Sequence, residues 1–160
     1  MNIVALSTVR LAELQAEVLA IPLVRVPDGS GHGHHNGPAG WINGLSNARV
    51  LMYDHPHLTT AVEELQDTYD LGAVRQILVN NMDPGAELSR HRDGYPNYFR
   101  YHLPVITNSD AYWWDELEGT LHMAVGSWHG PVPYCGILHS AGNPGTTDRL
   151  HVVVDFERTR

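Results

Sequence analysis

The second half of the chain consists of short β-rich segments separated by glycine- and proline-containing turns, and this pattern restricts the fold more than any other feature. Short strands that follow one another without helices between them are typical of a β-sandwich or a jelly roll, not of a parallel sheet. The predicted strands are 74–80, which ends at the turn Asp83-Pro84-Gly85, then 98–106, 119–128, 134–139 and 149–156. We therefore predict a mainly β core.

The first half is predicted to contain helices. Leu11, Leu14 and Val18 recur at helical spacing, which indicates a helix from residue 7 to about residue 19. A second helix is predicted from about Thr60 to Tyr69, where Thr60 and Glu63 form a possible capping box. The sequence before the β-rich half is thus of a different structural type.

A chain of 160 residues is expected to form one domain, with a helical and loop part at about 1–72 and a jelly-roll core at about 73–160. The Gly/His-rich segment 28–40 is a loop by composition. No apolar run is long enough to span a membrane, and the first residues do not resemble a secretion signal. We expect a cytoplasmic protein, and the sequence indicates no particular oligomeric state.

The charged residues exclude several function classes. The formal net charge is −8, which argues against a nucleic-acid partner, because phosphate binding needs clustered positive charge. All ten basic residues are arginine, so Schiff-base chemistry, pyridoxal phosphate attachment and a P-loop lysine are excluded. Arginine remains available for anionic small molecules, and its planar guanidinium suits a carboxylate.

A His-x-Asp pair suggests a metal site. His91 and Asp93 are two residues apart, so in an extended segment their side chains point to the same side and can reach one ion. His139 can supply a third ligand from a distant strand. Two imidazoles and one carboxylate on one face of a metal are the arrangement of non-haem Fe(II) oxygenases. The pair alone is a weak signal, since the chain has eleven histidines.

Two predicted strands carry polar residues on one face and aliphatic residues on the other. Arg100 and His102 share such a face, as do Arg149 and His151. In an arbitrary β protein these faces would point to solvent, because arginine is rarely buried without a partner. A barrel that holds a dicarboxylate beside a cation would instead need inward-facing arginine. Both orientations remain open at this point.

The stretch from about Ile77 to Phe156 resembles the aspartyl/asparaginyl β-hydroxylase family of Fe(II)/2-oxoglutarate dioxygenases, which also includes free-proline hydroxylases. The order and spacing of its motifs agree with that family. The matching segments are Asp83-Pro84-Gly85, His91-Arg92-Asp93-Gly94, Arg100-Tyr101-His102-Leu103-Pro104, Gly119, His139 with Asn143, and Arg149-Leu150-His151.

This resemblance implies a double-stranded β-helix, a cupin-like jelly roll, with the amino-terminal helices packed on its outside. It implies a catalytic Fe(II) held by His91, Asp93 and His139, with 2-oxoglutarate and O2 as co-substrates. Arg149 would bind the distal carboxylate of 2-oxoglutarate. The other co-substrate contacts that it implies are Arg100 and His102, near the carboxylate at the metal end, and Asn80, at a place where some members have a hydroxyl contact.

The predicted function is hydroxylation of an unactivated C–H bond in an amino acid or amino-acid-like small molecule, with conversion of 2-oxoglutarate to succinate. The metal carboxylate Asp93 favours hydroxylation over halogenation. A peptidyl aspartyl/asparaginyl β-hydroxylase is the alternative substrate class, and a non-catalytic cupin-like binding protein is the alternative of another kind. Segment 28–40 is expected either to cover the pocket as a lid or to be a passive linker.

Remaining histidines and tryptophans are less informative. His122 and His129 could line the pocket, but neither fits the ligand spacing of the family. Trp113 and Trp114 point to opposite faces if their segment is extended, so at most one of them faces a pocket.

Overall fold

The computed structural model describes residues 2–6, 8–27, 42–93, 98–132 and 135–158. The elements in chain order are β1 (Asn2–Ala5), α1 (Thr8–Leu19), β2 (Val24–Arg25), β3 (Ile42–Val50), the 3-10 helix η1 (Met52–Asp54), α2 (Pro56–Tyr69), β4 (Val74–His91), β5 (Phe99–Ile106), β6 (Tyr112–Asp115), β7 (Gly119–Leu121), β8 (Ser127–Val132), β9 (His139–Asn143) and β10 (Arg149–Phe156). Segment 28–40, predicted as a lid or a linker, lies outside the described residues.

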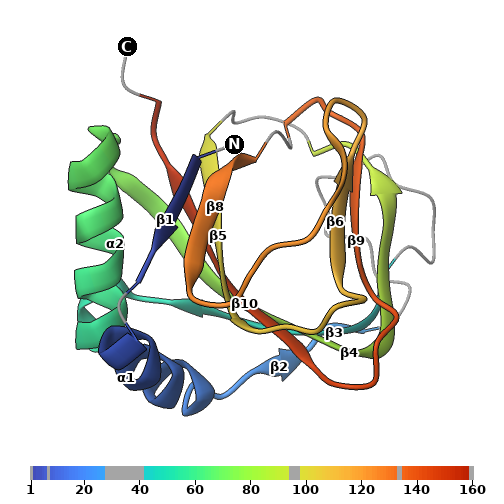
Figure 1. Ribbon diagram of the computed structural model, residues 1–160, viewed down its shortest axis with the longest axis horizontal. Helices are drawn as coiled ribbons and strands as arrows, with labels where there is room; N and C mark the ends of the chain where they lie inside the picture. Colours follow the sequence, from blue (N-terminus) through green and yellow to red (C-terminus); the bar gives the residue numbers. More distant parts are fainter. Residues whose placement is uncertain (1, 7, 28–41, 94–97, 133–134, 159–160) are drawn as a thin grey trace.

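The strands form one antiparallel sheet in the order β1-β8-β5-β10-β4-β9-β6-β7. Strand β3 also pairs with β4, and β2 pairs with β3. Figure 1 shows this sheet curling so that β5 and β8 lie across from β6 and β9. The predicted mainly β, jelly-roll fold is confirmed. It positions the ends of β4, β5, β9 and β10 around one interior.

The turn predicted at Asp83-Pro84-Gly85 is wrong, because β4 continues through these residues for a total of 18. The strand changes partner here: Met82 pairs with Arg149 of β10, and Ala86 pairs with Asn143 of β9. Asn143 supplies the physical reason, since its side-chain amide donates hydrogen bonds to the carbonyls of Met82 (2.8 Å) and Asp83 (3.1 Å). The backbone can therefore bend without leaving buried carbonyls unsatisfied.

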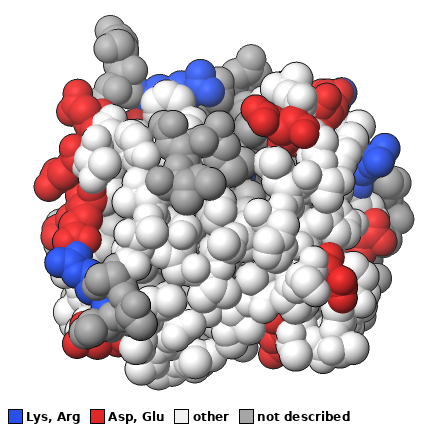
Figure 2. Space-filling model, viewed as in Figure 1, with Lys and Arg blue, Asp and Glu red and all other residues white. Residues whose placement is uncertain are grey.

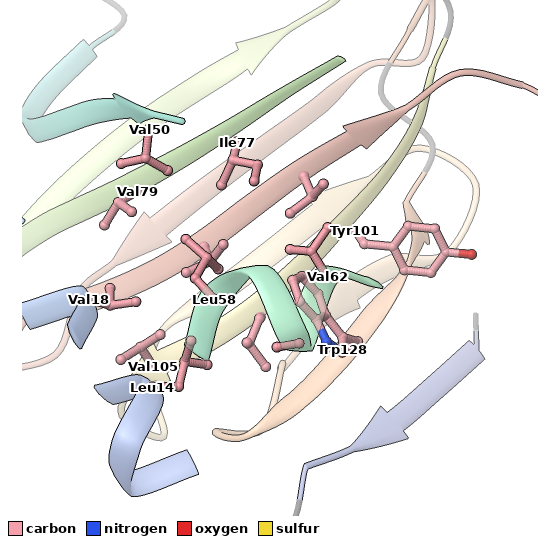
Figure 3. Close-up of a cluster of buried hydrophobic side chains, with 14 of the residues drawn as sticks. Leu14, Val18, Val50, Leu58, Val62, Ile77, Val79, Tyr101, Val105 and Trp128 are labelled. Atoms are coloured by element: carbon pink, nitrogen blue, oxygen red, sulfur yellow. The ribbon is translucent and has the colours of Figure 1, made fainter. Parts of the chain in front are cut away.

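Strand β10 is buried on both faces. Its aliphatic face, with Leu150, Val152 and Val154, belongs to a hydrophobic cluster that also contains residues of α1 and α2. Figure 3 shows Leu14 of α1 and Leu58 of α2 within this cluster, beside the strands. The polar face of the strand consequently points into the interior of the curled sheet, which decides between the two orientations that the sequence left open.

Helix α1 matches its prediction, but α2 begins at Pro56, earlier than expected, and the Thr60–Glu63 capping box is wrong. The Thr60 hydroxyl instead donates to the carbonyl of Pro56 (3.0 Å). The first-turn amides are capped from the other helix. The Glu17 carboxylate of α1 accepts hydrogen bonds from the backbone N–H of His57 (3.2 Å) and Leu58 (2.7 Å).

Strands β5 and β10 lie where they were predicted, whereas the shorter ones differ. The predicted strand 119–128 is divided into β7 and β8, with Gly126 at a positive φ of 75° between them. Strand β9 begins at His139, where the predicted strand 134–139 ends. Its sequence has low β propensity, and its extended conformation comes from pairing with β4 on one side and β6 on the other.

In Figure 2 acidic side chains lie along the helical side of the molecule and also on the opposite edge, and the middle of the face toward the viewer carries little charge. This distribution accompanies the formal net charge of −8 and offers no continuous basic surface on that face. Within the described residues, none of the helices combines the length and the hydropathy needed to cross a membrane.

Candidate active site

The structure brings His91, Asp93 and His139 together. His91 ends β4 and pairs directly with His139, the first residue of β9. Asp93 follows β4 and forms an isolated bridge with Cys135. One ligand atom from each side chain lies within 4.8 Å of the others. The Nε2 atoms of His91 and His139 are 3.3 Å and 3.8 Å from the Asp93 carboxylate oxygens.

Both imidazoles are oriented by backbone carbonyls. Nδ1 of His91 lies 2.8 Å from the carbonyl of Ser89, and Nδ1 of His139 lies 2.9 Å from the carbonyl of Ile137. A carbonyl only accepts hydrogen bonds, so each Nδ1 is the donating nitrogen, and Nε2 is the ring atom left to coordinate a metal. Burial, assisted by the neighbouring His91, lowers the pKa of His139 to about 4. Its ring is therefore neutral at pH 7, as metal binding requires.

An aromatic wall adjoins this triad. The Trp113 ring stacks on His139 with centroids 4.9 Å apart, and its other neighbour is His102, at 5.2 Å. The indole N–H of Trp113 donates to the buried carboxylate of Asp115 (3.2 Å), which fixes the ring. Trp114 faces the other way and lies under the Arg90 guanidinium. The segment is extended, and the two rings point to opposite faces, as predicted; the contact of Trp113 with His139 was not predicted.

A second group of polar residues lies deeper in the curled sheet. Arg149 is only 4% exposed, and its Nη1 atom donates a hydrogen bond to the sulfur of Met82 (3.3 Å). Among the described residues, its Nε and Nη2 atoms are buried without hydrogen-bond partners, as are both ring nitrogens of His102 and of His151. Buried polar atoms in proteins are nearly always satisfied, so donors left open in this way indicate a ligand site.

The electrostatics of this group favour an anion. Burial lowers the pKa of Arg149 from 12.5 to about 10, so the guanidinium keeps its charge at neutral pH. Burial and the nearby Arg149 charge hold the pKa values of His102 and His151 well below the ordinary 6.5. The two imidazoles are consequently neutral and can each donate one hydrogen bond. One fixed cation beside neutral donors suits a carboxylate.

Arg100 occupies a different position from Arg149. Its Nε and Nη2 atoms form a two-pronged pair with the buried Asp155 carboxylate at 2.7 Å and 2.8 Å. Its Nη1 atom lies 3.4 Å from Asp93, so the side chain reaches the metal-ligand cluster. Arg100 is thus at the predicted metal end, with most of its donors directed to protein. Between these two arginines, Arg149 is the one with open donors.

Asn80 is half-buried on β4, directly opposite His151 of β10. Side chains alternate along a strand, so Asn80 shares its face with Met82, which contacts Arg149. His122 and His129 were predicted only as possible pocket residues. Each has a ring nitrogen close to a backbone carbonyl, of Ala111 (3.1 Å) and Ala124 (3.2 Å) respectively, and neither joins the triad.

The sequence profile of the family described as aspartyl/asparaginyl beta-hydroxylase matches residues 46–159, most of the chain. The chain belongs to this family. The predicted enzyme class, an Fe(II)- and 2-oxoglutarate-dependent oxygenase of the hydroxylase type, is thereby confirmed.

Solved structures share the fold of this family member at low sequence identity. An oxidoreductase of the 2OG-Fe(II) oxygenase family from Burkholderia pseudomallei has a TM-score of 0.68 and 16% identity, over 99% of this chain and 86% of that one. HygX from Streptomyces hygroscopicus, with nickel and 2-oxoglutarate bound, has a TM-score of 0.69 and 8% identity, over 98% and 82%. A prolyl-4-hydroxylase from Pseudomonas putida has a TM-score of 0.63 and 14% identity, over 99% and 92%.

Proposed function

We propose that this protein hydroxylates an unactivated C–H bond of an amino acid or an amino-acid-like small molecule. In this proposal His91, Asp93 and His139 hold Fe(II), and Arg149 holds the distal carboxylate of 2-oxoglutarate. The observation that carries the proposal is the pair of open, buried donors on Arg149 beside two neutral imidazoles.

The donor set of the triad fits Fe(II). Two neutral imidazole nitrogens and one carboxylate leave other coordination positions of the metal open for small ligands. The backbone carbonyls that hold each Nδ1–H keep the Nε2 lone pairs aimed at the shared site. Iron held there would let O2 act as the oxidant: one oxygen atom would go to the substrate C–H bond and the other to 2-oxoglutarate, which would leave as succinate and CO2.

The remaining residues fit a dicarboxylate that reaches from the triad to Arg149. Trp113 contacts both His139 and His102, so it forms a wall between the two ends of such a ligand. His102 would donate a hydrogen bond to the ligand, and we assign Asn80 and Arg100 to its surroundings. In this arrangement the side chains bind, orient and exclude water, and none of them acts as a general acid or base.

A small substrate is favoured by the burial of the triad. The side chains of His91, Asp93 and His139 are 3%, 12% and 2% exposed, so the substrate must reach a deep site. The fold itself admits both kinds of substrate. One HygX structure contains hygromycin B, and a prolyl hydroxylase from Trichoplax adhaerens is in complex with a peptide fragment. Asp or Asn side chains of a polypeptide are therefore the second candidate.

The test is a substrate screen with the 160-residue chain, Fe(II), 2-oxoglutarate and O2. Free L-amino acids and short Asp- or Asn-containing peptides are incubated in parallel, and products one oxygen atom heavier are sought by mass spectrometry. We expect a product from a free amino acid, in proportion to the succinate formed and absent without Fe(II). Product from peptides alone would refute the small-molecule assignment.

A further inference from the structure

An exposed arginine separates the two metal-ligand candidates of the His-x-Asp pair. Arg92 lies between His91 and Asp93, and its guanidinium forms a two-pronged ion pair with Glu116, at 2.5 Å (Nη1 to Oε1) and 2.9 Å (Nη2 to Oε2). The same Nη1 atom donates to the carbonyl of Gly136 at 2.6 Å. Arg92 thus connects the end of β4 with the segment that precedes β9.

Glu116 connects the other side of this pair to the third ligand candidate. It follows β6, and its Oε1 atom accepts a hydrogen bond from the backbone N–H of Leu138 (2.9 Å). Its own backbone N–H donates to the Leu138 carbonyl (3.0 Å). Leu138 immediately precedes His139 in the chain. The Glu116 carboxylate therefore links the residue between two ligand candidates with the residue next to the third.

Asp93 depends on the same contacts. It lies beyond the last residue of β4, and its carbonyl accepts a hydrogen bond from the Gly136 N–H (2.9 Å). Arg92 binds the carbonyl of that same glycine. Segments 91–93, 135–139 and 115–116 are consequently joined at one place. An exposed ion pair elsewhere on a surface is worth little, but this one contacts the backbone beside all three ligand candidates.

We propose that Arg92 and Glu116 form a positioning clamp that sets the distance between the His91-Asp93 pair and His139 and so determines metal affinity. The inference rests on the proposed function, because it takes these three side chains as the metal ligands. The clamp touches neither the metal nor the substrate. It acts through the backbone, by holding two separate segments at one spacing.

The experiment is a titration of the metal-free 160-residue chain with Co(II), in which binding is measured by calorimetry and by the visible spectrum of bound Co(II). The variants are Glu116→Ala, Glu116→Gln, Arg92→Ala, Arg92→Lys and the double alanine variant. Glu64→Gln is the matched control, because Glu64 forms a comparable exposed ion pair with Arg10. Circular dichroism establishes that each variant is folded.

We expect the two single alanine variants to weaken Co(II) binding about tenfold, the lower end of the range for residues that support metal ligands. The double alanine variant should bind Co(II) no more weakly than either single variant, because each single substitution already removes the same ion pair. Glu116→Gln and Arg92→Lys retain part of the contacts and should recover part of the affinity. The bound Co(II) spectrum should change in the alanine variants and remain unchanged in Glu64→Gln.

A second measurement does not involve the metal. Hydrogen exchange of the Leu138 amide in the metal-free protein should be faster in Glu116→Ala, because its acceptor is removed. Wild-type Co(II) affinity and spectrum in both alanine variants would overturn the clamp while leaving the proposed function intact. If the His91→Ala variant instead bound Co(II) with wild-type affinity, the proposed metal site would be wrong, and the clamp with it.

Discussion

Replacing Arg149 by methionine should stabilise the ligand-free protein while weakening its binding of 2-oxoglutarate. Arg149 is 4% exposed, and two of its guanidinium nitrogen atoms have no hydrogen-bond partner in the part of the chain that the structure describes. Burial lowers its pKa from 12.5 to about 10. At about 1.4 kcal/mol for each pKa unit, the charge costs the folded protein about 3 kcal/mol. A methionine of similar length removes this cost and keeps most of the packing.

We therefore expect Arg149→Met to raise the free energy of unfolding by about 1–3 kcal/mol in the absence of ligand. For a chain of this length each kcal/mol corresponds to about 2–4 °C in Tm. Loss of the cation that faces a buried carboxylate should cost about 2–5 kcal/mol of 2-oxoglutarate binding. Stability and affinity should consequently change in opposite directions.

Thermal unfolding without ligand measures the first effect, and calorimetric titration of Co(II)-loaded protein with 2-oxoglutarate under nitrogen measures the second. Arg10→Met is the control, since Arg10 is exposed and far from the triad in sequence; neither quantity should change by more than about 0.5 kcal/mol. Arg149→Lys keeps the charge but loses the planar guanidinium, so its affinity should also fall. An Arg149→Met protein that is less stable and still binds 2-oxoglutarate normally would refute the reasoning.

Three further predictions concern the metal, pH and the helices. Asp93→Ala should lose Fe(II) and Co(II) affinity, measured by calorimetry, with no loss of helix content by circular dichroism. His102 and His151 have folded-state pKa values well below the 6.5 of the unfolded chain, so below pH 6.5 the unfolded state binds more protons. The stability contribution of the two neutral histidines is thus fully present above pH 6.5, and the free energy of unfolding should fall at lower pH by up to about 1.4 kcal/mol per pH unit for each histidine. Urea unfolding at several pH values measures this dependence. If a variant with both histidines replaced by glutamine lost stability with pH as steeply as the wild type, the prediction would be contradicted. Glu17→Ala removes the acceptor for the first-turn amides of α2 and should destabilise the protein by about 1 kcal/mol, whereas an unchanged urea midpoint would contradict the capping role.

Regular alternation made β10 and β5 predictable from the sequence, and the triad followed from residue type and family spacing. Whether the polar faces of β5 and β10 point into the barrel or to solvent was not predictable. Alternation separates Leu150 from Arg149, but either face can point inward. The orientation is decided by α1 and α2, which bury the aliphatic face of β10 in the hydrophobic cluster described above.

The features that the sequence did not reveal all depend on contacts between distant residues. The cap of α2 comes from Glu17, and the bend in β4 is satisfied by Asn143. Trp113 and Glu116 lie next to the site because β6 pairs with β9 beside His139. Such contacts leave no periodic signal in a single sequence.

The most direct test of the account is the visible spectrum of Fe(II)-loaded protein titrated with 2-oxoglutarate in the absence of O2. A keto acid that chelates Fe(II) produces a visible charge-transfer band, so the band reports simultaneous binding of both groups at one site. We predict that it appears at one equivalent of 2-oxoglutarate and is absent in His139→Ala. Binding of 2-oxoglutarate without the band, or with equal affinity in the metal-free protein, would contradict the central claim.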